Sequence, residues 1–251
     1  MNSIIELKNK VVLVTGATGG LGENICLELA AQGAIPVMHY HSNDQKASDL
    51  LQKITGMGID SMCVKADIRV ESEVQGMIKE IKAKFGRIDC LVNNAGVLSR
   101  GFLAMQSLEG FKDVVDINLF GNFLVLKHVS QLMIGQKSGS IVNMSSAAGM
   151  GGLKGQSVYS STKGALNSLT IVLAKEMADF NVRVNAVAPG FIASGMLEKP
   201  TRQDEKHKEV IPMKRFGAAS EVSSVVLFLL SEAASYMTGQ VLVIDGGLLI
   251  A

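Results

Sequence analysis

Short apolar runs alternate with longer amphipathic stretches along nearly the whole chain. The run Lys10–Thr15 (KVVLVT) is the first, and a continuous apolar run is typical of a strand buried on both faces. Similar β-rich runs recur after it. The predicted strands are Lys10–Thr15, Ile35–Tyr40, Asp60–Ala66, Ile88–Val92, Ser140–Met144, Val182–Val187 and Gln240–Ile244.

Between these runs, apolar residues recur at the spacing of one helix face. In Glu71–Phe85, for example, Val74, Met77 and Ile81 would point inward. Strand–helix alternation predicts an α/β fold, doubly wound, in which helices cover both faces of a seven-stranded, mostly parallel sheet in a single domain. The predicted helices are Gly20–Gln32, Asp44–Thr55, Glu71–Phe85, Phe111–Ile134, Val158–Ala178 and Ala219–Leu230.

One polar, irregular stretch interrupts this order. Glu198–Glu209 (EKPTRQDEKHKE) lies between apolar Phe191–Leu197 and Val210–Met213, after the carboxyl end of a predicted strand. Two interpretations stand side by side: an ordinary exposed helix or loop, and a substrate lid over about residues 191–215.

Composition narrows the class of protein. The chain has 251 residues and a net charge of +1, without a basic run, which disfavours nucleic acid or a membrane as partner. The first residues lack the pattern of a signal peptide, and no apolar run reaches the roughly 18 residues of a membrane span. Cys26, Cys63 and Cys90 are expected to be reduced core residues of a cytoplasmic protein. The histidines show no metal-ligand spacing, so no metal site is expected.

A glycine-rich turn, Thr15–Gly22 (TGATGGLG), follows the first predicted strand and opens the first predicted helix. Gly16 permits a tight turn, Gly20 lets the backbone approach a pyrophosphate, and Gly22 allows the helix to pack closely on the strand. The helix N-terminus attracts the phosphate charge. In this position the turn predicts dinucleotide binding.

A second candidate site lies in Tyr159-Ser160-Ser161-Thr162-Lys163. In a helix, Tyr159 and Lys163 lie one above the other on one face. A nearby ammonium stabilises phenolate, so Lys163 is expected to lower the pKa of Tyr159 from about 10 toward neutral pH. The pair would then serve as a general acid for a developing alkoxide. Alone it is weak evidence, because the same spacing occurs by chance on solvated helices.

These two features occur in one order with several others. Asn93–Gly96 (NNAG), Asn118 and Ser146 lie between them, and Pro189-Gly190 follows. In this combination the chain resembles the short-chain dehydrogenase/reductase family over residues 7–247. The resemblance implies a Rossmann-type fold and a nicotinamide-dependent oxidoreductase.

The resemblance also implies a catalytic set. The family's serine lies thirteen residues before the tyrosine, which selects Ser146 over Ser145, and it donates a hydrogen bond to the carbonyl oxygen where charge develops. Tyr159 would give the proton, and Lys163 would also bind the nicotinamide ribose. Asn118 matches the asparagine that holds a water of the proton relay.

The same resemblance implies how a cofactor is held. The glycine turn would hold the pyrophosphate, Asp67 would lie near the adenine, and residues 189–194 would cover the nicotinamide. The implied cofactor-binding residues are Gly16, Thr18, Gly19, Gly20, Leu21, Gly22, Tyr40, His41, Ser42, Asp67, Ile68, Asn94, Ala95, Gly96, Tyr159, Lys163, Pro189, Gly190, Ile192 and Ser194.

The end of the second predicted strand bears on the choice of cofactor. NAD-preferring relatives usually carry an acid there, which binds the ribose hydroxyls. Here Tyr40 takes that place, and His41 and Ser42 follow it as candidate ligands of a 2′-phosphate. We therefore expect NADP(H), with NAD(H) as the alternative.

The loops expected around the nicotinamide are apolar, which predicts an apolar substrate pocket. The overall pattern is similar to that of bacterial 3-oxoacyl-acyl-carrier-protein reductases, including polyketide-type ketoreductases, and implies a β-keto substrate that is small or bound to an acyl carrier protein. The alternatives are an alcohol, steroid or sugar-alcohol dehydrogenase, and an NADP-binding protein without turnover. The expected pocket residues are Leu98, Phe102, Ala147, Ala148, Met150, Leu153, Phe191, Met196, Leu197 and Met213.

Two predicted helices, Phe111–Ile134 and Val158–Ala178, are apolar on most of their circumference. Such helices must be buried on most sides. Relatives bury them between subunits, so a homotetramer is expected, with a dimer as the fallback.

Overall fold

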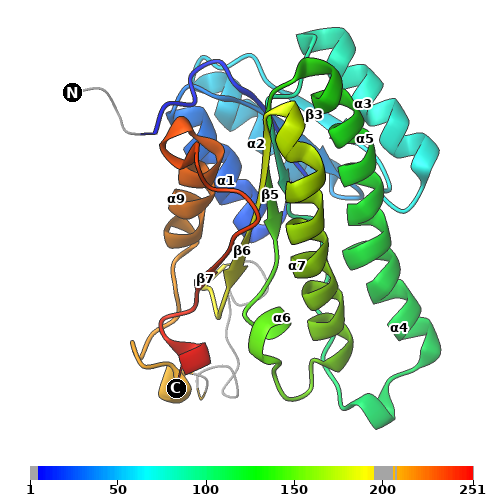
Figure 1. Ribbon diagram of the computed structural model, residues 1–251, viewed down its shortest axis with the longest axis vertical. Helices are drawn as coiled ribbons and strands as arrows, with labels where there is room; N and C mark the ends of the chain where they lie inside the picture. The colour runs from blue at the N-terminus through cyan, green and yellow to red at the C-terminus, as the bar shows by residue number, and fades with distance from the viewer. Residues whose placement is uncertain (1–4, 195–205, 207, 251) are drawn as a thin grey trace.

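Seven parallel strands form one sheet at the centre of the computed structural model, which describes residues 5–194, 206 and 208–250 (Figure 1). The strand order is β3-β2-β1-β4-β5-β6-β7, and each adjacent pair is parallel. The predicted doubly wound α/β fold is confirmed. The strands are β1 (Val11–Val14), β2 (Ile35–Tyr40), β3 (Met62–Lys65), β4 (Cys90–Asn93), β5 (Gly139–Met144), β6 (Val182–Pro189) and β7 (Val241–Ile244).

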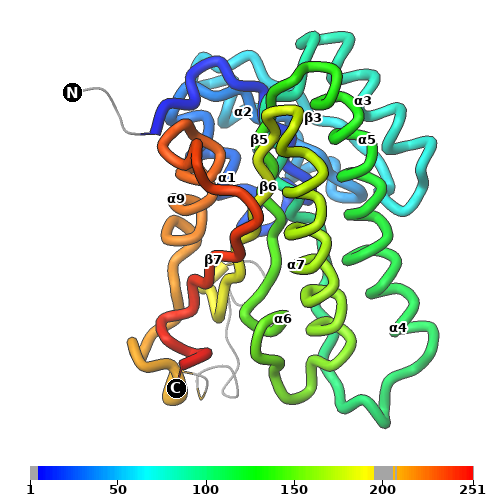
Figure 2. The backbone as a smooth tube through the Cα atoms, in the orientation of Figure 1, coloured from blue at the N-terminus to red at the C-terminus, as the bar shows by residue number. Residues whose placement is uncertain are grey.

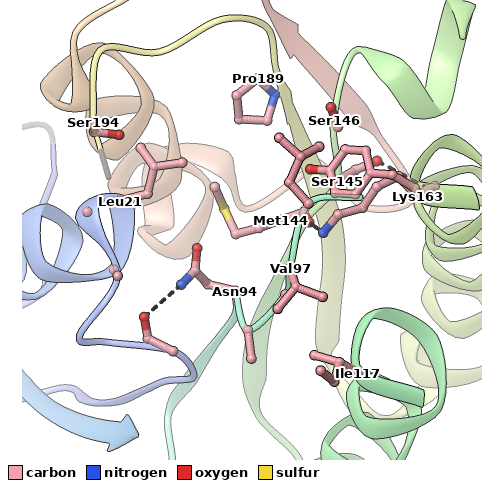
Figure 3. A pocket seen from close by; sticks show the side chains of 18 of the residues that line it. Leu21, Asn94, Val97, Ile117, Met144, Ser145, Ser146, Lys163, Pro189 and Ser194 are labelled. Carbon is pink, nitrogen blue, oxygen red and sulfur yellow. Dashed lines mark hydrogen bonds between the residues drawn. The ribbon is translucent and has the colours of Figure 1, made fainter. Parts of the chain in front are cut away.

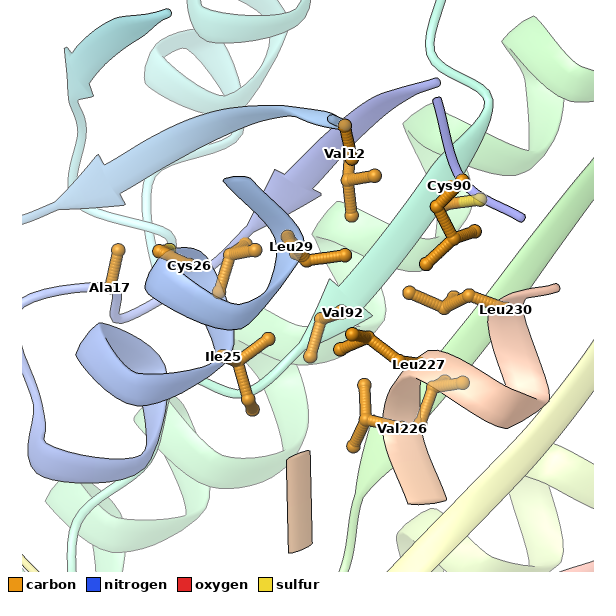
Figure 4. Close-up of a cluster of buried hydrophobic side chains, with 14 of the residues drawn as sticks. Val12, Ala17, Ile25, Cys26, Leu29, Cys90, Val92, Val226, Leu227 and Leu230 are labelled. Atoms are coloured by element: carbon orange, nitrogen blue, oxygen red, sulfur yellow. The ribbon is translucent and has the colours of Figure 1, made fainter. Parts of the chain in front are cut away.

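Helices cover both faces of this sheet because its strands are apolar on both sides. Along β1, Val12 and Val14 face one layer, and Val11 and Leu13 face the other. Helices α1, α2 and α9 pack on the first face, part of which Figure 4 shows, and α3, α5 and α7 pack on the second. The longer helices are α1 (Gly20–Ala31), α2 (Asp44–Gly56), α3 (Glu71–Phe85), α4 (Leu108–Val115), α5 (Asn122–Gln136), α7 (Ser157–Met177) and α9 (Ala219–Leu230).

The strand order reverses between β1 and β4. From β1 the chain winds outward through β2 and β3, and it then returns to β4 on the other side of β1. The loops that follow β1 and β4 therefore diverge and leave a crevice at the carboxyl ends of the strands. Ligands of open α/β sheets bind in such a crevice.

The first long helix begins earlier than predicted and is not regular throughout. A π-helical segment, Asp116–Gly121, joins α4 to α5, and the three segments run on beside α7 (Figure 2). The side chain of Ser107 caps the start of α4 by accepting a hydrogen bond from the Gly110 N–H at 3.0 Å. π-helical segments within helices are frequent at functional sites, and this one contains Asn118.

The cysteines match the expectation in part. Cys26 and Cys90 are buried, Cys63 is half-buried, and all three are free thiols. In the part of the chain that the structure describes, no helix is long and apolar enough to cross a membrane, and no cluster of potential metal ligands occurs. Most of the expected lid, residues 195–205 and 207, lies outside the described residues.

Candidate active site

A cavity of about 540 Å³ opens at the carboxyl edge of the sheet, where the loops after β1, β4, β5 and β6 meet (Figure 3). It brings together residues that are far apart in the sequence, from the glycine turn to the start of the expected lid. The predicted site residues that line it are Gly16, Thr18, Gly19, Gly20, Leu21, Gly22, His41, Ser42, Asp67, Ile68, Asn94, Ala95, Gly96, Ser146, Tyr159, Lys163, Pro189, Gly190, Ile192 and Ser194.

The glycine turn has the geometry of a phosphate cradle. Gly16 has φ +64°, a conformation that L side chains rarely adopt. A Cβ on Gly22 would lie 2.4 Å from the Gly16 carbonyl oxygen, so only glycine permits this approach of helix to turn. No side chain caps α1, and the backbone N–H groups of its first turn are therefore available to an anion at the cavity wall. The residues present fit the pyrophosphate of a dinucleotide.

Asn94 ties the end of β4 to this turn. Its side-chain amide donates to the carbonyl oxygens of Thr15 at 2.9 Å and Gly16 at 3.2 Å. The Thr15 hydroxyl in turn accepts a hydrogen bond from the Asn94 N–H at 2.8 Å. By contrast, Asn93 is buried and donates to Asn143 on β5 at 3.1 Å, so it supports the sheet.

Tyr159 and Lys163 lie one turn apart on α7, as predicted. The Lys163 Nζ lies 5.7 Å from the centroid of the Tyr159 ring and donates a hydrogen bond to the Met144 carbonyl oxygen at 2.6 Å. Figure 3 shows Lys163 reaching toward Met144 at the end of β5. Burial of the ammonium lowers the pKa of Lys163 to about 8. The lysine can therefore change its charge in a mildly alkaline solution.

The expected pKa shift of Tyr159 is wrong in direction. Burial of the phenol raises the pKa of Tyr159, and a hydrogen bond with Ser146 offsets only part of that rise. Lys163 does not reverse the shift, because its ammonium lies over the ring and bonds to Met144. Tyr159 consequently remains a protonated phenol at neutral pH, the form that a proton donor requires.

Ser146 is positioned by the turn that follows β5. Its hydroxyl oxygen accepts a hydrogen bond from the Ala148 N–H at 3.2 Å, at the start of the short helix α6 (Ala148–Gly151). The adjacent Ser145 is buried and donates to the Lys163 carbonyl oxygen at 3.3 Å. The side chain of Ser146 thus interacts with Tyr159, whereas that of Ser145 braces α7.

Asn118 does not line the cavity but lies behind it. Its side chain accepts from the Val97 N–H and donates to the Val97 carbonyl oxygen, both at 2.8 Å. A Cβ on Gly96 would lie 3.1 Å from the Asn118 Oδ1 and 3.5 Å from the Lys163 Nζ. The absence of a side chain at Gly96 therefore lets Asn118 and Lys163 lie close together.

The opposite end of the cavity carries a cluster of charged and polar side chains. The Asp67 carboxylate pairs with Arg69, the shortest contact being 2.6 Å, and lies 3.7 Å from His41. Hydrogen bonds from Arg69 hold the pKa of Asp67 down at about 2. Arg69 lines the cavity and was not predicted, although it follows Asp67 and Ile68 directly in the sequence.

The expectation for Tyr40 is corrected. Side chains alternate along a strand, so His39 lies on the side of β2 that borders the cavity while Tyr40 lies on the other side. His41, directly after β2, also lines the cavity. The Tyr40 hydroxyl donates to Asp44 at 3.0 Å, and Lys65 pairs with the same carboxylate. His39 is one of the wall residues that the sequence interpretation missed. Its place two residues before His41 is a signal for it only once the register of β2 is known.

Fewer of the expected pocket residues line the substrate end of the cavity than the sequence predicted. Leu98, Ala147, Leu153 and Phe191 line it. The expected residues Phe102, Ala148, Met150 and Met213 do not line it, and Met196 and Leu197 lie outside the described residues. Other residues that line the cavity and were not predicted are Ala66, Val97, Arg100, Ile117, Met144, Ser145 and Gln156.

Comparisons with known proteins agree with this geometry. Residues 16–249 match the family model described as Enoyl-(Acyl carrier protein) reductase. The chain is 42% identical to a 3-oxoacyl-[acyl-carrier-protein] reductase of Synechocystis sp., over 97% of this chain and 98% of that protein. It is 39% identical to the 3-oxoacyl-[acyl-carrier-protein] reductase FabG of Staphylococcus epidermidis, over 96% and 99%. A short-chain type dehydrogenase/reductase from Mycobacterium marinum superposes with a TM-score of 0.92 at 32% identity, over 98% and 97%.

Proposed function

Because the chain belongs to the short-chain dehydrogenase/reductase family and is an oxidoreductase of the 3-oxoacyl-[acyl-carrier-protein] reductase type, we propose that it reduces the ketone of a β-ketoacyl thioester with NADPH. The β-ketoacyl group is carried as a thioester on an acyl carrier protein or a small thiol, in fatty-acid or polyketide assembly. The observation that carries the proposal is the placement of Ser146, Tyr159 and Lys163 in the cavity that also holds the glycine turn.

The cofactor would be held along the whole cavity. The first turn of α1 would bind its pyrophosphate, Asp67 and Ile68 its adenine, and Lys163 and residues 189–194 its nicotinamide end. His41, Ser42 and Arg69 are the side chains that would meet a 2′-phosphate. When bound, NADPH supplies the hydride that the chain's own residues cannot supply.

The protein's part in the reaction is to bind the carbonyl oxygen and to move one proton. Ser146 would donate a hydrogen bond to that oxygen, which stabilises the negative charge that develops there. Tyr159 would transfer its phenolic proton to the same oxygen and complete the alcohol. Lys163 would stabilise the resulting phenolate, and Asn118, which lies behind the cavity close to Lys163, would take part in the relay that restores the proton.

The substrate class is tested by NADPH consumption with matched compounds. We expect turnover with acetoacetyl thioesters, best on a carrier protein, and little with free ketosteroids, ketosugars or simple ketones. Turnover of crotonyl thioester would instead favour reduction of a carbon–carbon double bond, the reaction of an enoyl-(acyl carrier protein) reductase. Turnover confined to alcohols, steroids or sugars would favour the alternative dehydrogenase. Binding of the cofactor without turnover of any compound would favour a non-catalytic protein.

Cofactor choice is tested by the ratio of kcat/KM for NADPH to that for NADH. The expected ratio is well above one, because no acid stands at the end of β2 to repel a 2′-phosphate and three polar side chains face that part of the cavity. A clear preference for NADH would overturn the assignment to NADPH and leave the chemistry at Tyr159 intact.

Asp67→Ala should weaken cofactor binding without moving the pH profile of turnover. The carboxylate would bind the adenine end, and loss of a charge-assisted hydrogen bond corresponds to roughly a tenfold change in affinity. Because the pKa of Asp67 is about 2, it does not titrate near neutral pH. Fluorescence titration with NADPH measures the affinity, and Asp60→Ala, which removes an exposed carboxylate outside the cavity, is the matched control. Unaltered affinity in Asp67→Ala would contradict a contact with the adenine.

We also propose that the chain assembles as a homotetramer. A shallow apolar hollow lies between α7 and the continuous segment from α4 to α5. Among its lining residues, Phe120, Phe123 and Val172 are 47%, 44% and 51% exposed. Exposed apolar patches of this kind mark interaction surfaces. At the C-terminal end, Leu248 is partly buried against the cluster of Phe191, Ile211 and Phe216, whereas Ile250 is exposed and available to a second interface.

Light scattering at micromolar concentration should give the mass of four chains, and Phe123→Glu should lower it by placing a charge in the apolar hollow. Deleting residues 248–251 should shift the tetramer toward a dimer. A monomer mass for the wild type would show that the hollow is simply exposed and would end the proposal.

A further inference from the structure

His39 joins the two segments of the cavity wall that the cofactor's adenosine half would touch. Its Nδ1 accepts a hydrogen bond from the Gly16 N–H at 3.2 Å, and its Nε2 is 3.0 Å from the Ala66 carbonyl oxygen. The side chain is only 2% exposed, yet it lines the cavity. One ring thus connects the glycine turn after β1 to the residue that precedes Asp67.

The hydrogen-bond partners fix the tautomer of this ring. A backbone N–H can only donate, so Nδ1 must carry a lone pair, and the proton must lie on Nε2 to reach the Ala66 oxygen. Both partners are backbone groups whose positions set the shape of the cradle. Gly16 has the positive φ of the glycine turn, and Ala66 directly precedes Asp67.

We propose that neutral His39 is a positioning residue for the dinucleotide, and that its protonation in acidic solution releases the glycine turn and weakens cofactor binding. This inference rests on the proposed function, because it assumes that the cavity binds a nicotinamide dinucleotide. His39 need not contact the cofactor, since it acts through Gly16 and Ala66.

The chemistry of the ring explains the sensitivity to pH. A protonated imidazole carries hydrogen on both nitrogens, so Nδ1 would then face the Gly16 N–H as a second donor. Burial lowers the pKa of His39, which keeps the ring neutral at physiological pH. Two titratable groups act on it. His41 directly after β2 opposes its protonation, and the Asp67 carboxylate after β3 favours it.

Two substitutions separate the two hydrogen bonds. An asparagine amide places its oxygen near the position of Nδ1, so His39→Asn retains an acceptor for Gly16 and loses the bond to Ala66. A glutamine amide places its nitrogen near Nε2, so His39→Gln retains the bond to Ala66 and leaves the partly buried Gly16 N–H without this acceptor. Neither side chain takes up a proton in the working range. His128→Gln is the control, because His128 is also partly buried and its ring lies 2.9 Å from Glu71, outside the cavity.

The experiment is calorimetric titration of each protein with NADP⁺ and NAD⁺ at pH values from about 7.5 to about 4.5, because burial moves the titration of His39 below the usual histidine range. NAD⁺ is included because a 2′-phosphate itself titrates near pH 6, about the value of phosphate monoesters. At the upper pH, His39→Gln should bind both cofactors roughly tenfold more weakly than wild type, the usual effect of an unpaired buried donor. His39→Asn should lose less, and His128→Gln should bind as wild type does.

On acidification, the ratio of wild-type affinity to His39→Asn affinity should fall for both cofactors. His41→Asn retains His39, so its affinity relative to His39→Asn should fall in the same way. Wild-type affinity in His39→Gln, or a constant ratio of wild type to His39→Asn across the pH range, would overturn the proposal. If His39→Gln fails to fold, the ratio of wild type to His39→Asn still decides. Failure of the wild type to bind either cofactor at any pH would instead overturn the proposed function.

Discussion

Tyr159→Phe should lower kcat by at least about 10²-fold, the lower range for loss of a general acid. The substitution removes the hydroxyl that would protonate the product oxygen and keeps the ring that packs in the cavity. Cofactor affinity should stay nearly unchanged, because the glycine turn and the adenosine end are untouched. Single-turnover measurements with NADPH separate the chemical step from binding.

The matched control for this substitution is Tyr236→Phe. Tyr236 is fully exposed and does not line the cavity, so its hydroxyl should have no effect on kcat. Wild-type turnover in Tyr159→Phe would show that another group supplies the proton and would refute the role assigned to Tyr159.

Lys163→Ala should lose both turnover and part of the cofactor affinity, because the lysine would serve the tyrosine and the nicotinamide ribose. The loss of kcat should be similar to that of Tyr159→Phe, at least about 10²-fold, because the phenolate would lose its neighbouring charge. Lys175→Ala is the control, since Lys175 is exposed on the same helix.

The pH profile distinguishes this role from a structural one. The pKa of Lys163 is about 8, so the ammonium is present below that pH and is lost above it. The rate of ketone reduction in the wild type should therefore fall as pH rises through about 8. The residual activity of Lys163→Ala should lack that step. Unchanged NADPH affinity in Lys163→Ala would remove the ribose role, and a wild-type profile without the step would remove the electrostatic one.

The sequence predicted the fold well because its signals are local and repeated. Buried parallel strands such as β1 are continuous apolar runs, and amphipathic helices such as α3 have a strong period. The structure has these two elements almost where the pattern placed them. The π-helical segment at Asp116–Gly121 could not be predicted, because its sequence continues the helical pattern on both sides.

The site was predictable where a motif fixes the backbone, and less so where side-chain direction decides. The glycine turn and the Tyr159–Lys163 pair are set by spacing within one element. Whether Tyr40 or its neighbours His39 and His41 face the cavity depends on the register of β2 in the sheet, which the strand alone does not reveal.

The sign of the Tyr159 pKa shift was beyond the sequence for a different reason. Spacing places an ammonium near the phenol, but burial of the phenol acts in the opposite direction. Only the three-dimensional structure shows that Lys163 bonds to Met144 and that Tyr159 is half-buried in the cavity wall. The same holds for His39, whose two backbone partners come from segments on either side of β2.

The most direct test of the central claim is the intact mass of an acetoacetyl-loaded acyl carrier protein after incubation with the protein and NADPH. Reduction of the ketone at the Tyr159 site predicts that the carrier gains two hydrogens with wild type and keeps its original mass with Tyr159→Phe. An unchanged acetoacetyl carrier in the presence of folded wild-type protein and NADPH would contradict the account.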